Sequence, residues 1–277
     1  MATKLPLYLK HLTFPLATAL MLLLGQCRDD NFPAKAPRLD YRLDYYIETY
    51  EVPGLEFNPQ TRVTYHYDDS GILQSYTVLS YNPSTGLLEE QRHFDFSYSN
   101  GKVAEIKEYL ADDSDPHIEY SYAYSPDGQV TKITEWNHAA GVDSDATFTY
   151  SQDSTIIVNY AFSNGESFKY EFDFAGRNII SDKTTRGEAL CSNGQYTYDQ
   201  KKNPFNMLGY TDYYLTNFSS NNKVTEDVSY LSCAFPTLIP QSYAYEYNNK
   251  GYPVTATTFY KDSETKSRRE FFYVSQP

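Results

Sequence analysis

The feature that most constrains the fold is a short motif that recurs from Tyr65 almost to the end of the chain. Two aromatic residues separated by one residue, or a close variant, precede a polar turn and then a β-branched or aliphatic residue. The copies are YHYDDSGIL (65–73), FSYSNGKV (96–103), YAYSPDGQV (122–130), FTYSQDSTIIV (148–158), FDFAGRNII (172–180), YTYDQKKNPF (196–205), TNFSSNNKV (216–224) and YEYNNKGYPV (245–254). A loose period of about 25 residues indicates an internal repeat.

Each copy of the motif predicts a β-hairpin. Residues two apart on a strand share a face, so the paired aromatics point the same way and the polar or small residue between them points to a wetter face. The turn must then reverse the chain with residues that tolerate positive φ. The residues at these places are Gly71, Gly101, Gly128 and Gly251, with Asn222 in the comparable place of the seventh copy.

Eight hairpins predict about 16 antiparallel strands in an up-and-down order, and no segment has a sustained helical stripe. The predicted fold class is all-β, a large antiparallel meander curled into a barrel-like or flattened roll. A barrel of about 16 strands has a wide lumen. We expect that lumen to be closed by flattening, with tyrosines and aliphatic side chains packed between the facing walls.

A barrel that contacts lipid is a poor alternative. Such a barrel needs an apolar band around its outer face. The strand sequence KVAEIKEY (102–109) places Lys and Glu on one face and mixes Glu with Ala and Ile on the other.

The first 26 residues behave as a separate unit. Lys4 and Lys10 precede a mostly apolar run from Leu12 to Leu24, and no acidic residue occurs among them. This pattern is typical of a secretory signal, and the run is too short to span a bilayer as a helix. We therefore divide the chain into a signal peptide (1–26), a segment with Cys27 and a tether that can include a first strand (27–60), and a repeat β domain (61–277).

The sequence LLGQC, ending at Cys27, resembles the lipobox of bacterial lipoproteins, although Gln26 stands where that pattern prefers Gly, Ala or Ser. The resemblance implies cleavage before Cys27 and lipidation of its thiol. The following CRDD resembles the acidic signal that sends some lipoproteins to the outer face of the outer membrane, which gives Asp29 and Asp30 that role. The alternative is a secretory signal without a lipid.

The copy YHYDDSGIL also resembles the YD repeat. Together with the lipobox, the run of hairpins from about residue 60 to 275 resembles a family of secreted bacterial lipoproteins whose domain of unknown function has a porin-like fold. The resemblance implies a large antiparallel sheet curled into a barrel or roll. It implies no known activity, and it provides no catalytic residues.

Charge and cysteine content restrict the partners and the compartment. A formal net charge of −13 disfavours nucleic acid, because a polyanion gains nothing by displacing the counterions of another. Cys191 and Cys233 are the only thiols after Cys27. Outside the cytoplasm they can form a disulfide, and the alternative is a pair of buried free thiols.

No motif predicts catalysis. The histidines after the signal (His66, His93, His117 and His138) lie in different hairpins without metal-ligand spacing, and the acidic stretches DDSDP (112–116) and GVDSDA (141–146) lack the spacing of a calcium loop. The chain has no G-x-S-x-G, no H-E-x-x-H and no phosphate-binding glycine loop. We therefore predict a protein that is not an enzyme and has no metal or cofactor.

The tyrosines offer the remaining functional signal. The chain has 29 of them, and a tyrosine presents both a flat ring and a hydroxyl, which suits capture of glycans or peptides. The simpler explanation is that most of them fill a wide core. The leading hypothesis is a surface-anchored binding module for a glycan, a peptide or an envelope partner. A structural envelope scaffold is second, and a hydrolase with two neighbouring carboxylates is third.

Overall fold

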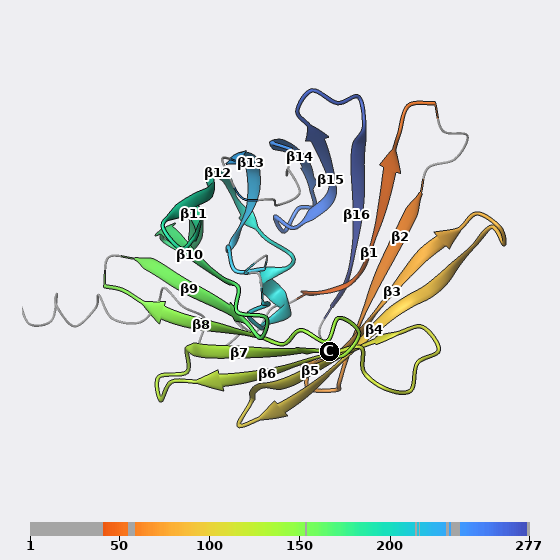
Figure 1. Ribbon diagram of the computed structural model, residues 1–277. Coiled ribbons are helices and arrows are strands. Elements are labelled where there is room, and N and C mark those ends of the chain that lie inside the picture. Colours follow the sequence, from red (N-terminus) through yellow and green to blue (C-terminus); the bar gives the residue numbers. More distant parts are fainter. Residues whose placement is uncertain are drawn as a thin grey trace, which may run out of the picture. The chain divides into compact units, whose positions relative to one another are not determined.

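The chain forms one closed antiparallel barrel of 16 strands (Figure 1). The computed structural model describes residues 41–54, 59–152, 154–213, 215, 217–230, 233 and 239–275. Each strand pairs with its neighbours in sequence, and β1 closes the barrel by pairing with β16. The strands are β1 (Tyr41–Glu51), β2 (Gln60–Tyr67), β3 (Leu73–Asn82), β4 (Leu87–Ser99), β5 (Lys102–Leu110), β6 (Ile118–Tyr124), β7 (Val130–Asn137), β8 (Ser144–Tyr150), β9 (Thr155–Phe162), β10 (Ser167–Ala175), β11 (Asn178–Arg186), β12 (Ala189–Lys202), β13 (Asn221–Tyr230), β14 (Gln241–Tyr247), β15 (Pro253–Tyr260) and β16 (Lys266–Ser275). The predicted all-β meander is confirmed.

The helical content is small in the part of the chain that the structure describes. Its one helix, η1 (Asn206–Leu208), is a single 3₁₀ turn. No described helix is long and apolar enough to cross a membrane. The predicted signal peptide (1–26) lies outside the described residues, as does most of the tether.

The repeated turns lie at one end of the barrel, which we call the motif end; the opposite end is the far end. At the motif end β4 turns into β5 through Asn100 (φ 52°) and Gly101 (φ 74°), the two positive φ values that a tight hairpin of this hand requires. The predicted positive φ is also present at the other motif glycines: Gly71 (87°), Gly128 (93°) and Gly251 (80°). Strand β1 begins and β16 ends at this same end.

A β-bulge recurs where the odd-numbered strands begin. Tyr98 faces Val103 and Ser97 faces Glu105, so Ala104 is an extra residue on β5. The same shift occurs at the starts of β1, β3, β7, β11, β13 and β15. A bulge bends its strand and increases its twist, which helps a large sheet curl into a barrel.

Tyrosine hydroxyls bond the backbone at these bulges. Tyr98 on β4 donates to the carbonyl of Leu73 on β3, and Leu73 is the residue just before the extra one. Six such bonds, 2.5–2.8 Å long, join an even strand to the preceding odd strand among the described residues. The pairs are Tyr67 with Leu43, Tyr98 with Leu73, Tyr124 with Val103, Tyr150 with Val130, Tyr245 with Lys223 and Tyr273 with Pro253. The motif tyrosine thus supplies a donor where the strand ladder is interrupted.

The exceptions support this assignment. Strand β9 pairs with β8 without a register shift, and the corresponding residue on β10 is Phe174, which has no hydroxyl. At the bulge of β11 the contact runs through Ser219, whose Oγ accepts from the Ile179 amide at 3.1 Å and donates to the Tyr198 hydroxyl at 3.1 Å. A tyrosine therefore accompanies a bulge, and a phenylalanine accompanies a regular pairing.

The predicted number of strand pairs, eight, was right, but the pairs are not the eight hairpins that the motif copies suggested. The sixth and seventh motif copies belong to a single pair of strands, β12 and β13, separated by residues 203–220. The eighth pair consists of β16 and β1, which are neighbours in the barrel but lie far apart in the sequence. One prediction was wrong as a result: Asn222 lies in β13 rather than in a turn, and its side-chain amide donates to Asp199 Oδ2 at 3.2 Å.

The two faces of the wall differ in chemistry. Phe96 is buried and Tyr98 packs against the same core cluster, whereas Ser97 between them is exposed, as the motif predicts. The outer face carries ion pairs between neighbouring strands, such as Lys107 with Glu119 at 3.3 Å and Lys132 with Asp145 at 2.8 Å. The apolar face of this barrel is therefore its inner face.

Residues 203–220, which we call the plug, leave β12 and enter the lumen before the chain continues as β13 (Figure 1, cyan). Phe205 contacts the Tyr46 ring with centroids 5.6 Å apart, and Tyr213 contacts Tyr160 at 5.0 Å on the opposite part of the wall. The Tyr213 hydroxyl also lies 2.5 Å from Ser144 Oγ. We expected the walls alone to fill the lumen, and an inserted segment supplies much of that filling.

Candidate functional site

A cavity of about 470 Å³ lies in the lumen between the plug and the strands from β10 to β16. The plug contributes Phe205 and Ser219 to its lining, and β15 contributes Ala256 and Thr258. Aromatic rings dominate the lining, with three phenylalanines and the tyrosines Tyr170, Tyr196, Tyr198, Tyr243 and Tyr245. The cavity thus has apolar ring surfaces together with hydroxyl groups that can bind a polar ligand.

An acidic side chain, Asp182 on β11, faces this cavity. The Tyr196 hydroxyl on β12 donates to its Oδ1 atom. Gly194 lies directly opposite Asp182 in the strand pairing, and a Cβ at this position would overlap both the carboxylate and the Tyr196 hydroxyl. The glycine therefore makes room for the pair. Burial raises the pKa of Asp182, and the bond from Tyr196 and the charge of Lys223 only partly oppose that rise.

A second polar group continues from the first along β13. Lys223 Nζ lies 4.4 Å from the centre of the Tyr196 ring and donates to Glu226 Oε2 at 2.9 Å. The Tyr243 hydroxyl on β14 donates to the same oxygen at 3.1 Å. A cation on a tyrosine face beside a carboxylate is a mutually stabilising arrangement. Asp182, Tyr196, Lys223, Glu226 and Tyr243 thus form one polar network across four neighbouring strands.

Arg269 on β16 supplies the other charge in the lining. Its Nε lies 3.1 Å from Glu48 Oε1, close enough for an ion pair, but the N–H does not point at the carboxylate and has no hydrogen-bond partner. Its guanidinium also lies 5.8 Å from the Phe205 ring. Burial lowers the pKa of Arg269, but the negative charge of Glu48 outweighs this effect and raises it overall, so the group is a permanent cation.

The burial of the tyrosines keeps their hydroxyls protonated. Burial raises the pKa of Tyr198 to about 12, with smaller contributions from Ser219 and the neighbouring acids. A neutral phenol both donates and accepts hydrogen bonds. The cavity thus presents charges that are already paired, neutral hydroxyls and ring faces, which suits an uncharged polar ligand with a flat or ring-shaped body.

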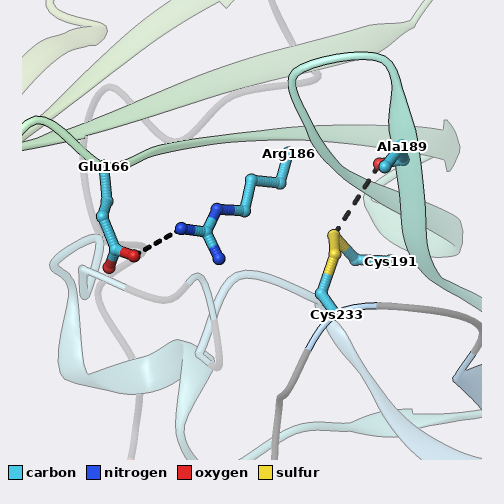
Figure 2. The surroundings of a disulfide bond; sticks show 5 residues. All are labelled: Glu166, Arg186, Ala189, Cys191 and Cys233. Atoms are coloured by element: carbon cyan, nitrogen blue, oxygen red, sulfur yellow. Dashed lines mark hydrogen bonds and ion pairs between the residues drawn. A yellow bond between two sulfur atoms is a disulfide. The ribbon is translucent and has the colours of Figure 1, made fainter.

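Of the residues predicted from sequence, Cys27, Asp29 and Asp30 lie outside the described residues. The structure joins Cys191 and Cys233 by a disulfide bond (Figure 2). Cys191 is the extra residue of a bulge on β12, and it is followed by Ser192, which lines the cavity.

The disulfide lies beside a short stretch of pairing in the wall. Among the described residues, β13 and β14 are paired only through Thr225 with Ser242 and Glu226 with Gln241. Cys233 belongs to the connection between these two strands, so the covalent bond ties that connection to β12. Nearby, Arg186 Nη2 donates to Glu166 Oε1 at 2.5 Å, as Figure 2 shows.

The histidines and acidic loops do not converge on this cavity. His93 pairs with Glu90 at 3.2 Å and His138 with Glu119 at 3.0 Å, both on exposed parts of the barrel. The acidic stretch 112–116 lies in the connection between β5 and β6. Within the described ranges, no three His, Cys, Asp or Glu side chains gather as metal ligands would.

Asp182, Lys223, Glu226 and Arg269 were not among the residues predicted from the sequence. A signal for two of them was present in the alternation of inward and outward side chains along the strands. Arg269 lies two residues before the buried Phe271, and Glu226 lies two residues before the buried Val228. A charged residue in phase with the core face of a strand indicates a polar group that points into the lumen.

The comparisons with known proteins concern the fold alone. No family model and no curated protein sequence matches the chain. A solved porin-like protein from Bacteroides uniformis superposes with a TM-score of 0.59 at 11% identity, over 88% of this chain and 99% of that one. A porin-like protein from Bacteroides vulgatus gives a TM-score of 0.46 at 12% identity, over 85% and 99% of the two chains. The chain therefore shares its fold with the first of these proteins.

Proposed function

We propose that this chain is a binding module of the cell envelope, and that its lumen cavity takes a ligand the size of a mono- or disaccharide. The observation that carries the proposal is the cavity of about 470 Å³ lined by aromatic rings and a connected polar network. Ligand sites are commonly clefts of about 300–1,000 Å³, mostly apolar, with a few placed polar groups. The volume and the lining both fit that description.

The polar network supports an uncharged, hydroxyl-rich ligand. Lys223 and Glu226 already neutralise each other, as do Arg269 and Glu48, so a charged ligand would have to displace one of these partners. A sugar hydroxyl can instead bond the carboxylate of Asp182 or a tyrosine hydroxyl of the lining while its ring lies on a tyrosine face. Because the side chains stand on paired strands, little ordering is needed on binding.

An envelope scaffold is the second candidate, and one feature of the outer wall favours it. Tyr45 and Phe272 stack there with ring centroids 4.2 Å apart, and the Arg62 guanidinium lies 4.1 Å from the Tyr45 ring. Exposed aromatic and Arg side chains are common anchors of protein interfaces. This patch would serve a protein partner and not a small ligand.

We also propose that a lipid on Cys27 holds the protein at the outer membrane and that Asp29 and Asp30 direct it to the cell surface. Support comes from the apolar run that ends at the cysteine and from the acidic residues that follow it. Cys27→Ser should leave the chain unacylated, measured by labelling with a fatty-acid analogue. Equal labelling of the variant and the wild type would contradict the anchor.

The ligand proposal is tested with a glycan array and a dipeptide array probed by the purified chain. Ala256→Leu narrows the cavity, and the matched control Thr257→Leu adds the same side chain at the next position, which points away from the lumen. We expect glycan binding that Ala256→Leu abolishes and Thr257→Leu preserves. Binding to neither array, or binding that Ala256→Leu leaves intact, would overturn the proposal. Recovery of the bound glycan in cleaved form would instead support the hydrolase.

A further inference from the structure

A cluster of lysines and tyrosines covers one side of the motif end. Lys201 and Lys202 end β12, and Lys250 lies in the turn between β14 and β15. Lys250 Nζ lies 4.1 Å from the Tyr41 ring, and Lys202 Nζ lies 4.5 Å from the Tyr252 ring. The rings of Tyr41 and Tyr252 are in turn 6.1 Å apart, so the contacts form one continuous cluster in which Tyr252, 2% exposed, is the buried support.

The three lysines are exposed, and none of them forms an ion pair with a carboxylate among the residues that the structure describes. Lys202 Nζ donates to the Tyr252 hydroxyl at 3.0 Å, and Lys201 Nζ lies 6.0 Å from the Tyr247 ring. Asp199 also lies on β12, and its carboxylate already accepts from the Tyr247 hydroxyl and the Asn222 amide. The lysine charges therefore remain available to an external anion.

This cluster contrasts with the rest of the molecule. The chain has a formal net charge of −13, and the connections at the far end include the acidic stretch 112–116. Among the acids at the motif end, Asp127 lies in the turn between β6 and β7, several strands from the cluster. Asp68 lies in the turn between β2 and β3, where its carboxylate accepts from the Ser70 and Ile72 amides. A local basic surface on an acidic protein attracts an anionic partner at one orientation only.

The position of the cluster identifies the partner. The described barrel begins at Tyr41, whose ring lies within the cluster, so the segment that leads back to Cys27 joins the barrel at this surface. We propose that the surface formed by Lys201, Lys202, Lys250 and Tyr41 docks the barrel on an anionic phospholipid membrane. The lysines meet the lipid phosphates, and the half-buried Tyr41 suits the boundary between headgroups and acyl chains.

Docking in this orientation has a structural consequence. The motif end, where the plug enters the lumen, would face the membrane, and the far end would face away from it. The proposal goes beyond the ligand proposed above and does not depend on it, because none of the four residues of this surface lines the cavity.

The test measures binding of the full chain to vesicles of phosphatidylcholine alone or with added phosphatidylglycerol. The variant carries Lys201→Gln, Lys202→Gln and Lys250→Gln, and the control carries Lys132→Gln, Lys169→Gln and Lys261→Gln, which remove the same charge elsewhere. Because all chains share the N-terminal segment, its contribution to binding cancels. We expect the wild type to prefer the anionic vesicles, and the cluster variant to lose on the order of 100-fold in partition coefficient.

The control should keep nearly wild-type binding, and replacement of the three cluster lysines by Arg should restore it. Unchanged thermal unfolding of each variant, followed by circular dichroism, establishes that the barrel is intact. Equal losses in the cluster variant and the control would show that net charge, and not this surface, controls binding. Equal binding of the wild type to neutral and anionic vesicles would also overturn the proposal.

Discussion

The bond between a motif tyrosine and a bulge carbonyl makes a sharp prediction at Tyr98. Tyr98→Phe removes only the hydroxyl, which donates to the Leu73 carbonyl at 2.5 Å. Leu73 is 2% exposed, so water cannot readily replace the lost donor. A hydrogen bond contributes about 0.5–1.5 kcal/mol net, and an unsatisfied buried carbonyl costs about 1–3 kcal/mol. We expect a loss of about 1–2 kcal/mol, or a fall in Tm of roughly 2–6 °C for a domain of this size.

Two further substitutions control for the loss of a hydroxyl and for the position in the repeat. Tyr45→Phe removes a hydroxyl from the outer wall and should change stability by less than about 0.5 kcal/mol. Phe174→Tyr adds a hydroxyl to β10, and the preceding odd strand, β9, pairs with β8 without a bulge. The added hydroxyl should therefore not stabilise the barrel. Urea unfolding followed by circular dichroism gives all three values. The reasoning is refuted if Tyr98→Phe costs no more than Tyr45→Phe, or if Phe174→Tyr stabilises the barrel.

Three other predictions concern the turn, the disulfide and the buried acid. Gly101→Val should lower the free energy of unfolding, measured by urea unfolding, by about 1–2 kcal/mol, since a β-branched residue tolerates the φ of 74° at this position poorly. Gly101→Asn should lower it much less, because Asn adopts positive φ more readily. Changing both Cys191 and Cys233 to Ser should cost about 2–4 kcal/mol, and a reductant should lower the Tm of the wild type to that of the double variant; a Tm insensitive to reductant would argue against the bond in solution. The raised pKa of Asp182 means that the folded protein holds its proton more tightly, so wild-type stability falls as pH rises above the ordinary value of 3.8. Asp182→Asn should remove that fall, and parallel Tm profiles over this range for both proteins would contradict it.

The repeat allowed the fold to be predicted because each motif copy contains its own local instructions. In FSYSNGKV the aromatic pair sets the inner face, and Asn100 and Gly101 set the turn. These are short-range effects that depend on side-chain alternation and on backbone sterics. The bulges were not predicted, because the sequence around an extra residue such as Ala104 has no distinctive pattern. The one related signal is Tyr124 on the next strand, whose hydroxyl donates to the Val103 carbonyl just before that extra residue.

The plug was missed because one of its ends imitates the motif. Phe218 and the following SSNNKV resemble a hairpin turn, but Phe218 packs against Phe174 inside the lumen with ring centroids 5.2 Å apart. The decisive information is the long-range contact of Phe205 and Tyr213 with distant strands, which no local pattern encodes. A long connection with little secondary structure of its own is often functional, and this one, whose described part has a single 3₁₀ turn, forms a wall of the candidate site.

The candidate site could not be assembled from the sequence for a related reason. Asp182, Lys223 and Glu226 lie on β11 and β13, which flank β12. Their proximity depends on the register of two strand pairs, and one of these pairs is interrupted by the 18-residue plug between positions 203 and 220. A shift of one residue in either register would turn these side chains to the outer face.

The chemistry of the wall determines how far the likeness to a porin-like protein extends. A barrel that spans a bilayer as a channel presents apolar side chains outward and polar ones to a wet lumen. Here the distribution is reversed: Lys132 and Asp145 pair on the outer face at 2.8 Å, while the lumen holds buried residues such as Ile133 and the plug. A solute could not cross a lumen filled in this way without displacing Phe205, Tyr213 and their partners. The same filling leaves a cavity with aromatic walls beside the plug, so the geometry that argues against passage through this barrel provides a place where a ligand can bind.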